Sequence, residues 1–462
     1  MTQDAQKFAP FAARMRAEGL DPLVIDTFAH YYGALADGQT GLIPESEIRP
    51  VASLPDAEAF GPDLVEQGLQ ALPSTLLLKL NGGLGTGMGL DRAKSLLPVK
   101  DGLTFLDIIA RQAGHGDLPL VLMDSFSTRD DSLAALAAYP DLVKGMPLDF
   151  LQNKVPKIRV SDLAPAEFPA DPDLTWCPPG HGDLYTAMVT SGMLARLLAA
   201  GYRYAFVSNA DNLGAVMDPA ILGYFVSQNL PFMMEAADRT EADRKGGHLA
   251  QLPDGQLVLR ESAQCPSADE ATFQDITRHR YFNTNNLWLN LEALADLMAA
   301  RQNFLGLAMI RNTKTLDPRD AASEPVYQLE TAMGSAIAVF TGAGAVRVPP
   351  TRFAPIKKTS DLLDVRSDNY ILTPDFQVVA NPARTLGRAF IDLDASVYRL
   401  VDALDARFPH GPPSLLECER LTVKGDVVFG RNVVVKGRVD LVNDGPDPRV
   451  IADGQVLTGD GV

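Results

Sequence analysis

A run of glycines followed by a lysine is the stretch of this sequence best suited to chemistry. The residues before it, 76–80, are four leucines and a lysine and predict a short buried strand. Five glycines follow within eight residues, and a lysine comes five residues later: Gly82, Gly83, Gly85, Gly87, Gly89 and Lys94. Because glycine lets the backbone adopt positive φ and approach a ligand, such a turn can direct several N–H groups at one phosphate. The stretch therefore predicts a phosphate-binding loop.

Two common nucleotide-binding motifs fit this loop imperfectly. A dinucleotide fingerprint, Gly-x-Gly-x-x-Gly, would place Met88 or Leu90 where its third glycine belongs. A P-loop would need glycine at both Met88 and Ala93, and Pro98 would interrupt the helix that its lysine opens. A plain glycine-rich hairpin stays open as the simplest alternative, although a hairpin needs neither five glycines nor a lysine.

Further polar residues stand where predicted strands end or helices begin. His181 lies between two glycines in the turn 179–183, just before a predicted helix whose N-terminus would attract anions. Asp211 follows a buried strand and suits Mg²⁺ or a ribose hydroxyl, with a simple Asx turn as the structural alternative. Residues 283–286 contain three asparagines, which suit sugar hydroxyls because each amide both donates and accepts. Lys357, next to another lysine, by itself indicates only a solvated surface.

These segments together resemble the UTP–glucose-1-phosphate uridylyltransferase family of the eukaryotic type, and the likeness covers nearly the whole chain. Its signature is the run Lys-Leu-Asn-Gly-Gly-Leu-Gly-Thr-x-Met-Gly, at residues 79–89. The resemblance implies two catalytic lysines, Lys94 and Lys357. It implies a nucleotide site made of Leu80, Asn81, Gly82, Gly83, Gln152, Gly180, His181 and Asp211. It implies a sugar-phosphate site made of His181, Asn209, Gly247, Asn283, Asn285, Glu330 and Lys357. Asp211 would also bind the Mg²⁺ cofactor, and Gln152 and Gly180 would contact the uracil.

The order of apolar segments predicts an α/β fold. From Leu76 to about Thr373, short apolar runs alternate with helical segments, which is typical of a mostly parallel sheet covered by helices. The resemblance implies a Rossmann-like, GT-A-like nucleotidyltransferase domain with a mixed sheet. We therefore expect an N-terminal helical segment, a catalytic domain and a C-terminal domain, at residues 1–60, 61–373 and 374–462.

The C-terminal residues carry a six-residue repeat. Its apolar members are Leu415, Leu421, Val427, Val433 and Val439, and the series resumes in phase at Ile451 and Leu457. This period predicts a small parallel β-helix, and the resemblance implies the left-handed kind. Because a short solenoid ends in open strand edges, we expect any association between copies of the chain to use this domain.

Composition restricts the partners. The net charge of −17 over 462 residues argues against nucleic acid, and a phosphate site must overcome this field with local lysines, backbone N–H groups and a divalent metal. No apolar run approaches the roughly 18–20 residues of a membrane span, and the N-terminus lacks a secretory apolar segment. Three widely spaced cysteines form no metal-ligand pattern and favour a reduced, cytoplasmic protein.

The resemblance implies an enzyme that converts UTP and glucose 1-phosphate into UDP-glucose and pyrophosphate. The sugar phosphate would attack the α-phosphorus of UTP directly, so no side-chain nucleophile is needed. A relative acting on another sugar phosphate, such as N-acetylglucosamine 1-phosphate, stays open. A catalytically inactive nucleotide-binding regulator is disfavoured because Lys94, Asp211 and Lys357 are all present. The glycine spacing also disfavours a dehydrogenase.

Overall fold

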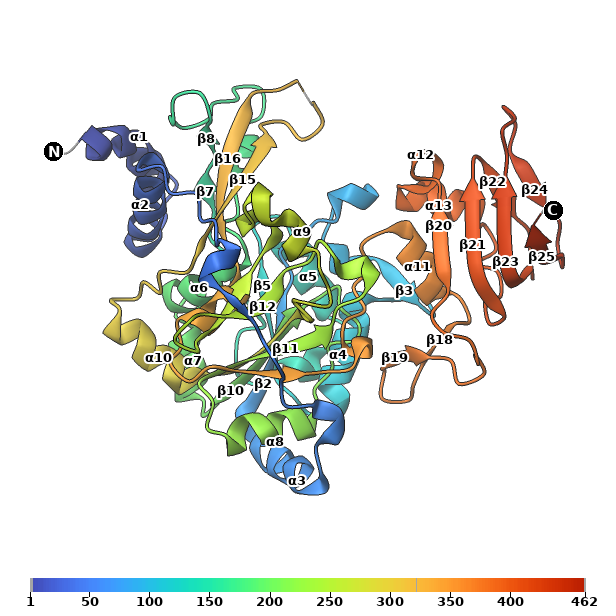
Figure 1. Ribbon diagram of the computed structural model, residues 1–462, viewed down its shortest axis with the longest axis horizontal. Helices are drawn as coiled ribbons and strands as arrows, with labels where there is room; N and C mark the ends of the chain where they lie inside the picture. The colour runs from blue at the N-terminus through green and yellow to red at the C-terminus, as the bar shows by residue number, and fades with distance from the viewer. Residues whose placement is uncertain (1–2, 321, 461–462) are drawn as a thin grey trace.

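The computed structural model describes residues 3–320 and 322–460 and extends along one axis (Figure 1). Two N-terminal helices lie at one end, an α/β body occupies the middle, and the C-terminal strands form the other end. Among the described residues, no helix is both long enough and apolar enough to cross a membrane.

A ten-stranded sheet forms the middle of the molecule. Its main path is β1 (Arg49–Pro50), β12 (His248–Gln251), β14 (Tyr281–Asn290), β10 (Tyr204–Asn209), β2 (Thr75–Leu80), β5 (Leu120–Asp124) and β6 (Asp149–Leu151). Three strands branch from it: β13 (Leu257–Arg260) from β12, β11 (Phe232–Asp238) from β14, and β17 (Gly344–Arg347) from β11. The strands from β10 to β6 are parallel, whereas β14 is antiparallel to both β10 and β11. The prediction of an α/β fold with a mixed sheet is confirmed.

Helices cover both faces of this sheet, which explains the continuous apolar run in β2. Leu76 and Leu78 pack on the face covered by α6 (Leu184–Thr190), α7 (Met193–Ala199) and α10 (Leu291–Ala300). Leu77 points to the other face, against α4 (Phe105–His115) and α8 (Pro219–Ser227). The remaining helices of the α/β body are α3 (Pro62–Ala71), α5 (Arg129–Leu136) and α9 (Glu270–Phe273).

The predicted N-terminal helical pair is present as α1 (Gln3–Ala17) and α2 (Pro22–Ala36). It packs on a small group of strands above the main sheet, through residues such as Phe28, Trp176 and Leu329. These strands are β7 (Val155–Pro156) with β9 (Trp176–Cys177), and β15 (Met309–Thr315) with β16 (Pro325–Thr331) and β8 (Ile158–Arg159).

The C-terminal strands are parallel, as the six-residue repeat predicts. One row is β20 (Phe390–Leu393), β21 (Cys418–Lys424), β23 (Val434–Val442) and β25 (Val456–Asp460), and a second row is β22 (Val427–Phe429) with β24 (Arg449–Ile451). All seven repeat residues are buried. That these strands form a left-handed β-helix stays a prediction.

The core of the C-terminal strands continues into the rest of the chain. The same apolar cluster contains Met88 and Leu97, which flank Lys94, and Leu362 of α11 (Thr359–Arg366). Around this junction lie β3 (Pro98–Lys100) with β4 (Leu103–Thr104), β18 (Tyr370–Leu372) with β19 (Val378–Ala380), α12 (Ala395–Tyr398) and α13 (Val401–Arg407). The apolar core therefore crosses the predicted division at residue 374, and that division stays a prediction.

Candidate active site

The glycine-rich segment forms a folded loop after β2. Gly85 and Gly89 adopt left-handed φ values of 68° and 80°, which favour glycine. The N–H of Lys94 donates to the carbonyl of Gly83 at 3.0 Å and folds the loop back on itself. No α-helix follows: Lys94 begins a 3₁₀ turn, and Pro98 then starts β3. The loop is thus neither a P-loop nor a simple hairpin.

Two charged residues meet at the carboxyl ends of β2 and β10. These strands are parallel neighbours with Leu80 opposite Asn209, so the segments that follow them begin side by side. The Lys94 Nζ lies 2.6 Å from the Asp211 Oδ2, and both side chains are mostly buried. The lysine and the carboxylate that the sequence predicted at one site therefore form an ion pair here.

A cavity of about 310 Å³ opens beside this ion pair. It is lined by all eight residues predicted for the nucleotide site: Leu80, Asn81, Gly82, Gly83, Gln152, Gly180, His181 and Asp211. Lys94 and Asn209 also line it. The Gln152 Nε2 donates to the Gly180 carbonyl at 2.8 Å, which joins the segment after β6 to the 180 turn.

The 180 turn requires glycine for two reasons. Gly180 has a φ of 78°, and a Cβ added to it would lie 2.5 Å from the carbonyl oxygen of Thr331. Gly182 is equally close to Thr331. The turn therefore packs directly on β16, and no side chain fits between them.

His181 is held as a neutral hydrogen-bond donor. Its Nδ1 accepts from the N–H of Met333 at 3.0 Å, and burial lowers its pKa to about 4. Near neutral pH the remaining proton is therefore on Nε2, which is free to donate to a phosphate or sugar oxygen in the cavity.

Asp183 bonds to the segment after β6 rather than to the helix that follows it. It precedes α6, but its side chain caps no helical N–H. Instead it accepts from the backbone N–H of Asn153 at 2.7 Å and from the Asn153 Nδ2 at 3.0 Å. Burial raises the pKa of Asp183 to about 7. Its contacts tie the 180 turn to the segment that carries Gln152.

A second group of predicted residues gathers at the start of β14. The Asn283 N–H donates to the Gly247 carbonyl at 3.1 Å, and the Asn283 Nδ2 donates to the Asn285 Oδ1 at 2.9 Å. Asn285 adopts a left-handed φ of 57°, which asparagine tolerates better than most residues. These three residues, predicted for the sugar phosphate, are therefore neighbours.

Glu261 joins this group, and sequence reasoning missed it. A Cβ on Gly247 would collide with the Glu261 carboxylate. Burial raises the pKa of Glu261, against the hydrogen bond from Asn283 and the positive charge of Lys357. The available signal was a carboxylate immediately after an apolar strand, the same pattern that pointed to Asp211.

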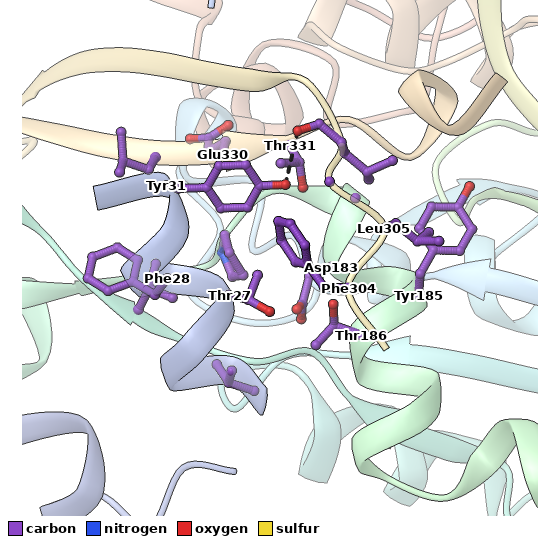
Figure 2. A pocket seen from close by; sticks show the side chains of 17 residues that line it. Thr27, Phe28, Tyr31, Asp183, Tyr185, Thr186, Phe304, Leu305, Glu330 and Thr331 are labelled. Carbon is purple, nitrogen blue, oxygen red and sulfur yellow. Dashed lines mark hydrogen bonds between the residues drawn. The ribbon is translucent and has the colours of Figure 1, made fainter. Parts of the chain in front are cut away.

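Glu330 lies away from the group in which the sequence placed it. It lines a separate cavity between α2, the 304–307 segment and β16, which Tyr31, Thr27 and Asp183 also line (Figure 2). Burial also raises the pKa of Glu330, opposed by a hydrogen bond from Asn312. A Cβ on Gly180 would lie 2.9 Å from the Glu330 Cβ, so Glu330 packs behind the turn. Its assignment to the sugar phosphate stays a prediction, and Glu261, beside Gly247 and Asn283, is a second carboxylate that could take that role.

Lys357 is exposed beside Asp211. The N–H of Ile356 donates to the Asp211 carbonyl at 3.4 Å, which places Lys357 one residue from that contact. Its Nζ lies 5.5 Å from the centre of the Phe353 ring. Lys357 therefore lies close to Asp211, at the edge of the cavity that Asp211 and Lys94 line, but does not itself line that cavity.

A buried polar network holds the Asp211 and Lys357 segments together. Glu235, fully buried, accepts from the Arg352 Nε and Nη2, both at 2.7 Å, and from the Trp288 Nε1 at 2.9 Å. The Asn212 Nδ2 donates to the Arg352 carbonyl at 3.0 Å, and its Oδ1 accepts from the Ala354 N–H at 2.9 Å. These hydrogen bonds hold the segment that carries Asp211 against the segment that leads to Lys357.

The side chains near the glycine loop could hold Mg²⁺ only together with substrate phosphates and water. Within the described residues, no three or more His, Cys, Asp or Glu side chains cluster closely enough to hold a metal by themselves. Mg²⁺ commonly takes one or two carboxylates and completes its shell with substrate phosphates and water. Asp211, beside the glycine loop, is the carboxylate that could hold the ion in this way.

Comparison with known proteins identifies the family. The sequence model of the UTP–glucose-1-phosphate uridylyltransferases matches residues 26–436, which is most of the chain. The chain belongs to this family. The uridylyltransferase of Encephalitozoon cuniculi is 39% identical over 403 residues, covering 86% of this chain and 79% of that protein. The Solanum tuberosum enzyme is 40% identical over 394 residues, covering 84% and 80%.

Solved structures agree with this membership of the uridylyltransferase family. A UDP-glucose pyrophosphorylase variant from Leishmania major, in complex with UDP-glucose, is 44% identical, with a TM-score of 0.89 and coverage of 97% of this chain and 98% of that chain. A structure from Trypanosoma brucei described as a UDP-glucose phosphorylase is also 44% identical, with a TM-score of 0.88 and coverage of 98% of both chains. The similarity therefore extends over the N-terminal helices, the α/β body and the C-terminal strands.

Proposed function

We propose that this protein is a nucleotidyltransferase that joins UTP and glucose 1-phosphate to give UDP-glucose and pyrophosphate. The observation that carries the proposal is the cavity at the ends of β2 and β10, where the glycine loop, the Lys94–Asp211 pair and neutral His181 meet. The activity named for its relatives supports the same reaction.

Binding would divide between two groups of residues. Leu80, Asn81, Gly82 and Gly83 would hold the nucleotide, with Gln152 and Gly180 against the uracil edge. Gly247, Glu261, Asn283 and Asn285 would hold the sugar, with His181 and Asn209 at the boundary between the two substrates. Amide and carboxylate groups suit this task because glucose presents hydroxyls that both donate and accept.

The chemistry requires orientation and charge neutralisation. A phosphate oxygen of glucose 1-phosphate attacks the α-phosphorus of UTP in line, and the bond from that phosphorus to the oxygen of the β-phosphate breaks. Lys94 would stabilise charge on the α-phosphoryl group and the departing pyrophosphate, while Lys357 would bind the incoming sugar phosphate. Asp211 and the substrate phosphates would hold Mg²⁺, which would supply further neutralisation of the triphosphate. No acid or base is needed, because the attacking phosphate is already an anion near neutral pH.

One assay tests the reaction and its sugar. The protein is incubated with UTP, Mg²⁺ and, separately, glucose 1-phosphate, galactose 1-phosphate and N-acetylglucosamine 1-phosphate, and pyrophosphate is measured. The proposal expects release with glucose 1-phosphate at the highest kcat/KM. Preference for another sugar would make this a related UDP-sugar enzyme, and no release with any sugar would make it an inactive nucleotide-binding member.

We also propose the finer organisation expected from the sequence. The C-terminal strands, 374–462, would form a left-handed β-helix appended to a catalytic domain of residues 61–373. Exposed valines on its last strands, Val442, Val450 and Val456, favour association between copies through this part. Sedimentation of the full chain and of a truncation after Pro382 tests the association, which the truncated protein should lose.

The location of the protein is proposed from its cysteines. All three are free, which favours the reducing cytoplasm.

A further inference from the structure

Behind the residues proposed to bind the sugar lies a buried row of side chains: Arg239, His248, Arg260 and His279. Gly247 and Glu261 are each adjacent in sequence to a residue of this row, respectively His248 and Arg260. In the sheet, His248 is the register partner of Arg260 on β13 and of Phe282 on β14, the residue before Asn283. Because successive residues of a strand point to opposite faces, the side chains of this row lie behind the sugar pocket.

The buried row contains two arginines, whereas burial lowers the pKa of both of its histidines and keeps them neutral near pH 7. The Arg260 side chain is 0% exposed, and its guanidinium lies 5.7 Å from the centre of the Phe273 ring. The Arg239 guanidinium lies 5.6 Å from the same ring, and the ring of His248 stacks on that of His279 with a centroid separation of 3.9 Å. A buried guanidinium is stable only when acceptors satisfy it. Backbone carbonyls satisfy Arg239, whereas Arg260 depends on carboxylates.

Glu45, from the connector after the N-terminal helices, is one of the two carboxylates that pair with Arg260. Its Oε2 accepts from the Arg260 Nη1 at 2.8 Å. Its Oε1 accepts from the Arg278 Nε at 2.8 Å and lies 3.0 Å from the His279 Nε2. The second carboxylate is Asp269, whose Oδ2 lies 3.1 Å from the Arg260 Nη2.

The connector is also fixed by its backbone. The N–H of Glu45 donates to the Asp269 Oδ2 at 2.7 Å, and the N–H of Ile43 donates to the Gln264 carbonyl at 2.7 Å. The segment 260–279, which carries the two arginines that pair with Glu45, therefore also holds the backbone of the connector in place. Nothing in this set of contacts reaches the glycine loop or Lys94.

We propose that Glu45 is a positioning residue for the sugar phosphate: by pairing with Arg260 it fixes the end of β13 and so aims the adjacent Glu261 at the sugar. The inference rests on the proposed function, because it assumes that Glu261 and Asn283 bind the sugar. Without the Glu45 carboxylate, Arg260 keeps only Asp269, and the strand end moves to bring the guanidinium toward water. Glu261 moves with it, while the nucleotide cavity, built on β2 and β10, keeps its shape.

The test is Glu45→Gln, compared with Glu47→Gln on the same 3₁₀ turn, whose carboxylate is exposed. Glu45→Gln should raise the KM for glucose 1-phosphate about tenfold and leave the KM for UTP and kcat within about twofold, the pattern of lost ground-state binding of one substrate. Glu47→Gln should match the wild type. An unchanged KM for glucose 1-phosphate, or an equal rise in both KM values, would overturn the proposal.

Two further variants separate this inference from the site on which it rests. Glu261→Gln should itself raise the KM for glucose 1-phosphate; if it does not, the sugar site is wrongly assigned and the inference falls with it. If Glu261→Gln has this effect and Glu45→Gln does not, only the inference fails. Should Glu45→Gln not fold, as judged by thermal unfolding, Asp269→Asn decides, because removing the other partner of Arg260 should raise the same KM selectively.

Discussion

Replacing Lys94 with alanine tests the centre of the proposed mechanism. The Lys94 Nζ is 2.6 Å from Asp211, and the side chain is only 16% exposed, so water screens its charge weakly. A unit charge about 4 Å from a phosphate oxygen is worth about 4 kcal/mol at an effective dielectric constant of 20. Only the part of this interaction energy that is gained in the transition state, and not already in the bound substrate, is lost from kcat when the lysine is removed. Removing one such group costs about 10²–10³ in rate, or about 2.7–4 kcal/mol, in comparable oxyanion sites.

The expected result is therefore a kcat lower by about 10²–10³ and a much smaller change in UTP affinity. Pyrophosphate release at saturating substrates gives kcat, and equilibrium binding of UTP with Mg²⁺ gives the affinity. Lys358→Ala is the matched control, because Lys358 is an exposed lysine that does not line the cavity. A Lys94→Ala enzyme with wild-type turnover would refute the assignment, and a loss confined to UTP binding would make Lys94 a binding residue only.

Three other changes have defined outcomes. Gly180→Ala should raise the KM for UTP at least about tenfold, because the new Cβ has no room against β16, whereas Gly33→Ala, which has open space around it, should be neutral in the same assay. Burial lowers the pKa of His181 to about 4, so between about pH 6.5 and 4 the unfolded chain binds a proton that the folded protein does not. The free energy of unfolding should therefore fall as pH drops from about 6.5 toward 4. His181→Gln should make this fall less steep, as measured by urea titrations at several pH values. Glu235→Ala should lower stability by about 3–5 kcal/mol, because it leaves the buried Arg352 uncompensated; an unfolding midpoint equal to that of the wild type would show that the pair contributes nothing.

The nucleotide half of the site could be predicted because it depends on local features of the chain. A strand followed by glycines, and a second strand followed by Asp211, are visible in the sequence, and parallel pairing then brings their ends together. The family resemblance added the residues, such as Gln152, that come from more distant segments. All of them lie around one cavity.

The sugar half was harder to predict because it depends on long-range packing. Glu261 enters the site through a hairpin, β12–β13, whose register no short motif reveals. Glu330 shows a second difficulty, since the resemblance assigns it to the sugar phosphate whereas its side chain lines a different cavity. In the structure Asp183 bonds to Asn153, and Glu330 packs behind the 180 turn, so each supports the site from outside it.

The shared core beneath the glycine loop gives the C-terminal strands a part in phosphate chemistry. Met88 and Leu97, on either side of Lys94, are buried in the cluster that the repeat valines fill, and so is Leu362, five residues after Lys357. A Cβ on Gly89 would lie 3.0 Å from Leu400, at the beginning of α13. The relative positions of Lys94 and Lys357 therefore depend on packing against the C-terminal strands, which hold none of the predicted site residues. A volume change in the core of these strands should first disturb the alignment of Lys94, proposed to act on the triphosphate, with Lys357, proposed to bind the sugar phosphate.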